Sequence, residues 1–238
     1  MQKLSLLFTH DGLQYLLTKN KTVLEEQDFF VSDETPQDFI FSKLTEILLQ
    51  KQFSEINVIS ALNHFTMMPE GFSQHDAGFD LIGFNADADR NNEELMLAVN
   101  KKFAVQFYYT MPNHLYLKIK EASKTTRFNF SGEKFLSSIN VKNQKEIHIN
   151  LYHHQCEFFC FDQKKVVLYN NLDVNSEVDF LYFIMFTLSK IGFGTAETQF
   201  FVYGETTRNE TFISELRKFV KNLKIVFDNI PNKNFILN

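Results

Sequence analysis

The chain has 238 residues, a formal net charge of −5 at pH 7 and a hydrophobic fraction of 44%. This length and composition suffice for one large domain, or for two closely joined halves, with a sizeable core. The negative charge argues against non-specific binding to nucleic acids, which requires a basic surface. We therefore expect no nucleic-acid partner.

No segment predicts export, membrane insertion or a disulfide bond. The N-terminal stretch reaches His10-Asp11-Gly12 before any apolar run of signal-peptide length. No apolar run approaches the roughly 20 residues that span a bilayer. Cys156 and Cys160 are predicted on one strand, about 13 Å apart, which is too far for a disulfide. We therefore expect a cytoplasmic protein without a transmembrane segment.

The first part of the chain predicts antiparallel strands followed by a helix. Apolar patterns and turn residues delimit these elements. Thr35 is expected to cap the helix with its hydroxyl, with Pro36 at the first helical position. The predicted elements are strands at 4–8, 13–18 and 22–31, a helix from Thr35, and a buried strand at 56–60.

Residues 64–144 are predicted to form an α/β insertion before a second copy of the same plan begins. The insertion is expected to contain a short strand at 81–85, a helix at 91–101, a strand at 104–109, and helices at 112–120 and 133–139. The second copy is expected to contain strands at 147–151, 156–161 and 166–168, a helix capped by Ser176, a strand at 198–203 ended by Gly204, and a helix at 209–223.

The two copies agree in element order, spacing and helix capping. The first strand, at Leu4, recurs at Ile147, and the helix cap at Thr35 recurs at Ser176, so the two sequence offsets are nearly equal (147 − 4 = 143 and 176 − 35 = 141). We therefore predict a mixed α+β (α/β) fold of duplicated βββαβ units, divided into 1–63, 64–144 and 145–238. The alternative is two ordinary antiparallel sheets, each with its own packing helix.

Several stretches, taken in order, resemble a known family. They are Phe65 to Phe72 (FTMMPEGF), Phe79 to Asn85 (FDLIGFN), Asn171 to Tyr182 and Val202 to Gly204. They resemble a family from Bacteroidetes, domain of unknown function 3822, that has the fold of the actin-like ATPase superfamily (actin, Hsp70 and sugar kinases). The resemblance covers nearly the whole chain. It implies that fold, with a cleft between two halves.

The same resemblance points to three turns as candidate binding sites. ATP-using members of the superfamily carry Asp-x-Gly in the first hairpin, a similar second hairpin, and a glycine-rich turn near the last strand. The positions here are His10, Asp11 and Gly12, then His153 and His154, and finally Gly204. His10 stands where Asp is expected, and the second hairpin lacks glycine. Nucleotide hydrolysis and an ATP–Mg²⁺ cofactor are therefore disfavoured.

No other pattern predicts catalysis or a metal site. Adjacent residues on a strand point to opposite faces, so His153 and His154 are not expected to bind one metal together. Asp11 is interpreted as a turn residue that bonds its own backbone. Nucleophile-elbow, Walker and His-Glu-x-x-His motifs are missing from the sequence. We expect no catalytic and no metal-binding residues.

The sequence therefore predicts a non-catalytic actin-like protein that acts as a cytoplasmic interaction or scaffold module, with an unidentified protein partner. Two alternatives stay open. One is an unconventional ATPase or kinase that uses Asp11. The other is a small-ligand or pH-sensing module that uses His10 and His153.

Overall fold

The computed structural model describes residues 2–50, 53–72, 77–230 and 234–237. The chain forms two compact units, named unit 1 (residues 1–134 and 236–238) and unit 2 (residues 135–235). The short helix α4 (Ser131–Ser138) contains the point where one unit passes into the other. Residues 64–134 belong to unit 1, while the division into three parts at 63/64 and 144/145 stays a prediction.

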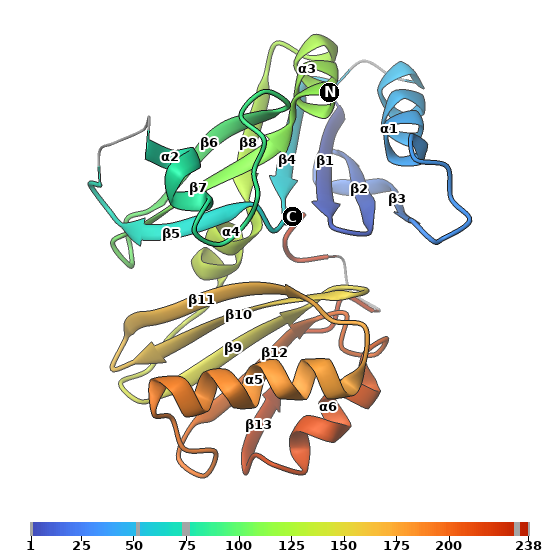
Figure 1. Cartoon of the computed structure of the whole chain (residues 1–238). Helices are drawn as coiled ribbons and strands as arrows, with labels where there is room; N and C mark the ends of the chain where they lie inside the picture. Colours follow the sequence, from blue (N-terminus) through green and yellow to red (C-terminus); the bar gives the residue numbers. More distant parts are fainter. Residues whose placement is uncertain (1, 51–52, 73–76, 231–233, 238) are drawn as a thin grey trace. The chain divides into compact units, whose positions relative to one another are not determined.

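Unit 1 is built on a five-stranded sheet with the order β3-β2-β1-β4-β8 (Figure 1). Its strands are β1 (Gln2–Thr9), β2 (Gly12–Lys19), β3 (Thr22–Phe30), β4 (Glu55–Ser60) and β8 (Thr126–Phe130). The first three strands are antiparallel neighbours, whereas β4 runs parallel to β1 and β8 runs parallel to β4. Helices α1 (Phe39–Gln50) and α3 (Asn113–Ala122) pack on one face of this sheet, around Leu44 and Leu115.

A smaller sheet in unit 1 corrects two predictions. It has the order β5-β7-β6, formed by β5 (Phe65–Pro69), β7 (Val105–Pro112) and β6 (Glu93–Asn100). The helix predicted at 91–101 is strand β6, because it pairs with β7 along its whole length. The strand predicted at 81–85 is wrong as well, since helix α2 covers Gly78–Ile82. Short apolar runs fit either element, and strand pairing decides between them.

Unit 2 repeats the arrangement with the strand order β11-β10-β9-β12-β13. Its strands are β9 (Glu146–Leu151), β10 (Gln155–Asp162), β11 (Lys165–Asp173), β12 (Gln199–Gly204) and β13 (Asn222–Ile225), and its helices are α5 (Glu177–Ile191) and α6 (Glu210–Arg217). The helix predicted at 209–223 is shorter than expected, because residues 222–225 pair with β12 as a strand.

The strand register confirms the duplication in detail. Leu4 pairs with Leu17 and Ile147 pairs with Cys160, so both partners recur at the same offset (147 − 4 = 143 and 160 − 17 = 143). The register shift after Leu17 in β2 recurs after Cys160 in β10, again at this offset. Because register and bulges are specific features of a strand pair, two unrelated sheets are not expected to share both.

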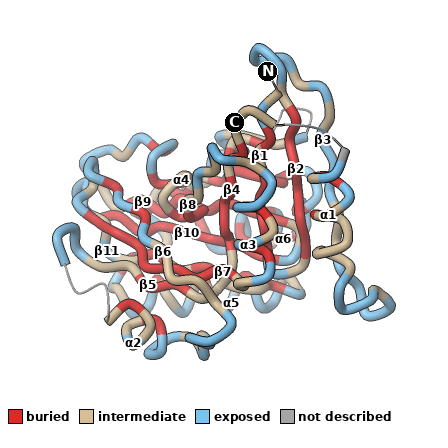
Figure 2. The backbone as a smooth tube through the Cα atoms, turned by 90° about the horizontal axis from the view of Figure 1, so that it is seen from above, coloured by how far each residue is buried: buried red, intermediate tan, exposed pale blue. Residues whose placement is uncertain are grey.

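The hairpin turns and cores repeat with the same spacing. Asn20 and Lys21 have positive φ angles, as do Gln163 and Lys164, the equivalent pair in unit 2 (163 − 20 = 143). The sheet residues of the two cores also correspond. Those of unit 1 include Leu4, Leu6, Phe8, Leu13, Tyr15 and Leu17, and those of unit 2 include Ile147, Ile149, Leu151, Cys156, Phe158 and Cys160. Figure 2 shows burial concentrated along these central strands in each unit.

The two equivalent helices begin differently. The hydroxyl of Ser176 accepts a hydrogen bond from the amide of Asp179, which confirms the predicted cap of α5. The predicted cap at Thr35 is wrong. Helix α1 begins at Phe39, and the Thr35 hydroxyl instead accepts a hydrogen bond from the amide of Ser32, 2.8 Å away, within the preceding turn.

Candidate functional site

The first candidate turn joins β1 to β2 in unit 1. The Thr9 hydroxyl donates to the Asp11 carboxylate over 3.0 Å, and the Asp11 carbonyl accepts a 2.7 Å hydrogen bond from the amide of Val31. A Cβ atom on Gly12 would lie 2.5 Å from the Phe29 carbonyl oxygen. Gly12 is therefore required by the close approach of β3. His10 is exposed at the tip of the turn.

The second candidate turn joins β9 to β10 in unit 2 and has the same backbone plan. The His154 carbonyl accepts a 2.9 Å hydrogen bond from the amide of Val174, which repeats the bond from Val31 to Asp11 at an offset of 143 (174 − 31 and 154 − 11). His154 thus stands at the position of Asp11, and His153 at that of His10. The buried Gln155 occupies the glycine position, and its amide donates to the Asn171 side chain over 2.7 Å.

The geometry of the two histidines differs from the expectation. Their ring centroids are 3.9 Å apart, with planes inclined by 68°. The predicted opposite orientation is wrong, because both residues lie in the turn and not on a strand. The alternation of strand side chains therefore does not apply to them.

The third candidate turn follows β12. Gly204 has a φ of +86°, and a Cβ atom there would lie closer than 3.0 Å to the Leu151 carbonyl and the Asn150 side chain. The Asn209 amide group donates to the carbonyls of Tyr152 and Glu205, over 2.9 and 2.8 Å. A side chain thus ties this turn to the second hairpin. The binding roles of these turn residues stay predictions.

Sequence reasoning missed a buried polar network in unit 2. Glu157 is fully buried on β10, and its carboxylate accepts hydrogen bonds from the Asn150 amide (2.9 Å) and from the hydroxyls of Tyr152 (2.6 Å) and Tyr169 (2.7 Å). The signal in the sequence was a single Glu within the apolar run Cys156 to Phe161. A buried carboxylate requires such donors to offset the loss of hydration.

His148 forms a second buried cluster on β9. Its Nε2 lies 3.0 Å from the Glu146 carboxylate, and its Nδ1 lies 3.0 Å from the Tyr203 hydroxyl. Its ring stacks on Phe201 with centroids 4.7 Å apart. Burial lowers the pKa of His148 below its ordinary value, and the opposing effect of Glu146 is smaller. His148 is therefore neutral in the folded protein at neutral pH.

This lowered pKa predicts a loss of stability in mild acid. In the unfolded chain, His148 binds a proton near pH 6.5. The folded state resists that proton, so the stabilisation present above pH 6.5 is lost as the pH falls. We expect the free energy of unfolding to drop by up to about 1.4 kcal/mol per pH unit below pH 6.5. Urea denaturation at pH 7.5, 6.5 and 5.5 measures this slope.

The matched controls are His148→Gln, expected to flatten the slope, and His10→Gln at the exposed turn position, expected to keep it. Parallel pH profiles for the wild type and His148→Gln would contradict the assigned role of His148.

The two cysteines are unreactive side chains of the core. Both are buried and free. Burial raises the pKa of the Cys160 thiol to about 12 and raises that of Cys156 further, with Glu157 and Asp173 adding to the effect. Because the thiolate is the reactive form, neither cysteine is suited to redox or nucleophilic chemistry at neutral pH.

The duplicated sheets and their turns define a protein with the actin-like ATPase fold. A protein of unknown function from Bacteroides thetaiotaomicron, whose crystal structure has this fold, superimposes with a TM-score of 0.81 at 18% sequence identity, over 99% of this chain and 93% of that one. The family is equally clear. Residues 1–223 match the model of the family described as protein of unknown function (DUF3822), and the chain belongs to that family.

More distant structures share the fold. A chain of the PilM-PilN type IV pilus biogenesis complex has a TM-score of 0.60 at 8% identity, over 97% of this chain and 92% of that one. The ethanolamine utilization protein EutJ from Carboxydothermus hydrogenoformans has a TM-score of 0.54 at 7% identity, over 100% and 89% of the two chains. No curated protein matches the sequence significantly. Within the described residues, the helices are too short or too polar to cross a lipid bilayer.

Proposed function

We propose that the chain is a non-catalytic member of the actin-like fold that acts in the cytoplasm as an interaction or scaffold module. The observation that carries this proposal is the close packing and the bulky residues at the three candidate turns, where ATP-using members of the superfamily bind phosphate. At Gly12 and at Gly204, a backbone carbonyl of a neighbouring strand lies within 3.0 Å of the position that a Cβ atom would take, so both turns are closely packed on that side. The second hairpin carries Gln155 in place of glycine, directly after two histidines. Phosphate loops require open backbone amides, which bulky or closely packed turns do not offer.

A fold-level analogy supports a role in protein assembly. One protein of similar fold is part of the PilM-PilN type IV pilus biogenesis complex. That role belongs to the other protein, and the sequence identity of 8% transfers only the fold. The analogy favours a protein partner over a chemical substrate.

The proposal predicts that Mg²⁺-ATP does not bind. Isothermal titration calorimetry and thermal unfolding, with ATP and Mg²⁺ at millimolar concentration, should give neither saturable heat nor a shift of the melting temperature. At 100 times its dissociation constant, a ligand of the folded state would add about 2.7 kcal/mol of stability, which such scans readily detect.

If Mg²⁺-ATP does bind, the Asp11→Asn variant shows whether Asp11 takes part. Saturable binding that disappears in Asp11→Asn would overturn the proposal in favour of an unconventional ATPase. Binding that survives in Asp11→Asn would also overturn it and would place the nucleotide elsewhere.

A further inference from the structure

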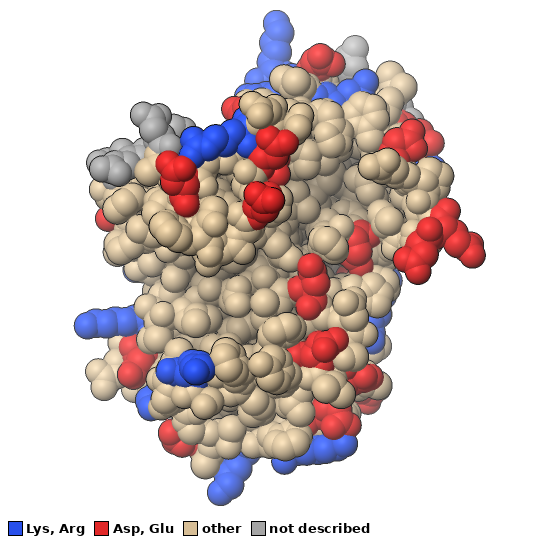
Figure 3. All heavy atoms as spheres, viewed as in Figure 1, with Lys and Arg blue, Asp and Glu red and all other residues tan. Residues whose placement is uncertain are grey.

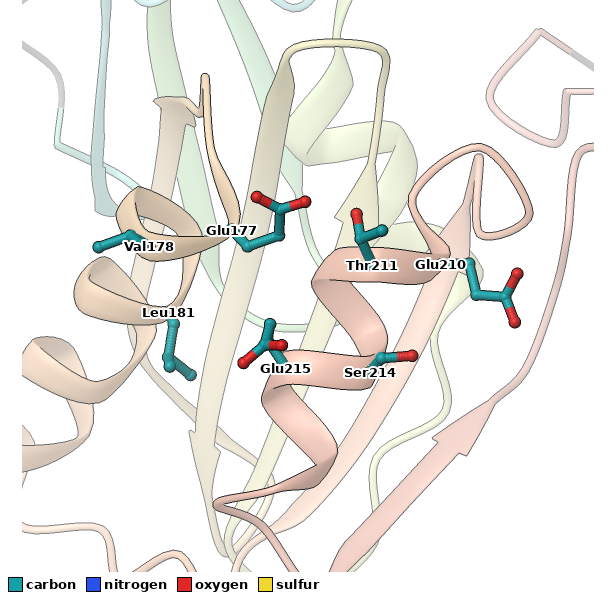
Figure 4. Close-up of a pocket in the computed structure, with 7 residues that line it drawn as sticks. All are labelled: Glu177, Val178, Leu181, Glu210, Thr211, Ser214 and Glu215. Atoms are coloured by element: carbon teal, nitrogen blue, oxygen red, sulfur yellow. The ribbon is translucent and has the colours of Figure 1, made fainter.

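Helices α5 and α6 of unit 2 leave an open groove between them, with a volume of about 510 Å³. It is lined by Glu177, Val178, Leu181, Glu210, Thr211, Ser214 and Glu215. Figure 4 shows the side chains of Glu177, Leu181 and Glu215 facing the space between the helices, whereas Val178 and Glu210 lie at its outer edges. The groove therefore places the apolar side chain of Leu181 between a carboxylate of α5 and a carboxylate of α6.

An apolar stripe runs along α5 beside the groove. Val178, Tyr182 and Phe186 are 75%, 59% and 48% exposed, and their spacing of four residues places them on one face of the helix. The rings of Tyr182 and Phe186 stack with centroids 5.7 Å apart. Single exposed apolar residues are normal, but a row of them beside a groove is typical of a contact surface. The space-filling view in Figure 3 shows a largely uncharged surface over α5.

The charged residues that line the groove are all negative. Its lining residues include three glutamates and no Lys or Arg among those that the structure describes. Hydrogen bonds from its own backbone amide and from Thr211 lower the pKa of Glu177, so it is ionised at neutral pH. Helix dipoles explain acidic residues in a first turn, such as Glu177 and Glu210. They do not explain Glu215, which lies in the last turn of α6 and forms an ion pair with Lys218. Both side chains of this pair are accessible to solvent, and surface ion pairs of this kind contribute little energy, so Glu215 can exchange Lys218 for a cation of a partner.

We propose that this surface, named the α5–α6 surface (Glu177, Val178, Leu181, Tyr182, Phe186 and Glu215), binds a basic amphipathic helix of a partner protein. The proposal rests on the interaction role proposed above and specifies the partner's chemistry. Apolar side chains spaced four residues apart on the partner helix match the stripe on α5, in the manner of helix-in-groove recognition. Lysine or arginine on its flank complements Glu177 and Glu215.

The dimensions define the partner segment. From Val178 to Phe186 the stripe extends about 12 Å, at 1.5 Å per helical residue. A partner helix of about three turns matches the length of the stripe. A contact of this size falls in the class of small, transient interfaces, for which micromolar dissociation constants are expected.

Fluorescence anisotropy with two synthetic helices tests this proposal. One fluorescein-labelled 15-residue peptide carries Leu at every third or fourth position with Lys elsewhere, and the second carries Glu in place of Lys. We expect the lysine peptide to bind at least tenfold more tightly than the glutamate peptide. Tyr182→Ser/Phe186→Ser should weaken its binding at least tenfold. Glu177→Gln/Glu215→Gln should weaken it about fivefold and reduce its dependence on salt.

Matched controls distinguish binding at this surface from non-specific electrostatic or hydrophobic binding of the peptide elsewhere on the protein. Leu49→Ser removes an exposed apolar residue from α1 of unit 1, and Glu34→Gln/Glu121→Gln removes two exposed carboxylates from the same unit. Both are expected to keep wild-type affinity. Far-ultraviolet circular dichroism and melting curves confirm that every variant folds. Equal affinity for the two peptides, or an equal loss in variants and controls, overturns the proposal.

Sedimentation velocity tests the competing occupant, a second copy of this chain. Self-association that Tyr182→Ser/Phe186→Ser abolishes would overturn a partner helix as the occupant. The nucleotide titration described above is independent of these variants. A failed peptide experiment therefore leaves the non-catalytic role standing, whereas nucleotide binding removes that role without deciding what the α5–α6 surface binds.

Discussion

Gly204→Ala is expected to destabilise unit 2 by about 3 kcal/mol or more. Two effects combine. The residue has a φ of +86°, a conformation that costs an L-residue about 1–2 kcal/mol. The new Cβ would also lie closer than 3.0 Å to the Leu151 carbonyl, which is backbone and cannot rotate away. Forced overpacking of this kind adds typically about 1–3 kcal/mol.

Gly192→Ala is the matched control in the same unit. Gly192 ends α5 with a φ of +70°, and nothing lies within 4 Å of the position that its Cβ would take. The Gly192→Ala variant should therefore lose only the conformational contribution, about 1 kcal/mol of its free energy of unfolding. Urea denaturation followed by circular dichroism measures both variants. Equal destabilisation of the two would show that the close approach of β9 to Gly204 contributes nothing.

Glu157→Ala is expected to destabilise unit 2 by about 3–5 kcal/mol. The substitution removes the acceptor of three buried donors, namely the Asn150 amide and the hydroxyls of Tyr152 and Tyr169. Donors left buried without an acceptor lose their hydration and gain nothing in return. The cavity left by the side chain adds to this loss.

Graded variants test the network more finely. Tyr152→Phe and Tyr169→Phe each remove one donor and leave the carboxylate with the others, so each should cost about 1–2 kcal/mol. Denaturation of the single variants and of Tyr152→Phe/Tyr169→Phe measures their coupling. A Glu157→Ala variant as stable as the wild type would mean that the carboxylate is not held by these donors in solution.

Most of the fold was predictable because the duplicated strands carry strong local signals. The strand around Ile147 alternates polar and apolar residues, the strand around Leu4 alternates as far as Leu6 and is apolar from there to Phe8, and turn residues follow both. The family and the superfamily fold are confirmed. The errors in element type fell on short segments such as 93–100, where pairing with β7 overrides local preference. The predicted cap at Thr35 failed for another reason, because its hydroxyl bonds the preceding turn and α1 begins at Phe39.

The sequence predicted where the turn residues lie along the chain but not how their side chains are arranged. The equivalence of His10 with His153 follows from the constant sequence offset between the two copies, which the strand register confirms. The edge-to-face contact of the His153 and His154 imidazoles depends on the conformation of the turn, which the sequence pattern did not predict. The network around Glu157 could not be foreseen, because its donors come from β9 with the turn after it and from β11, and only the fold brings these two segments together around β10.

Crystallisation with Mg²⁺ and a non-hydrolysable ATP analogue tests the central claim most directly, because it shows the duplicated body and its turns together. We predict two superimposable sheets, with the turns at residues 9–12, at 152–155 and after Gly204 unchanged and no adenylate density beside them. Density for the analogue's phosphates against the backbone of any of these turns would contradict the account.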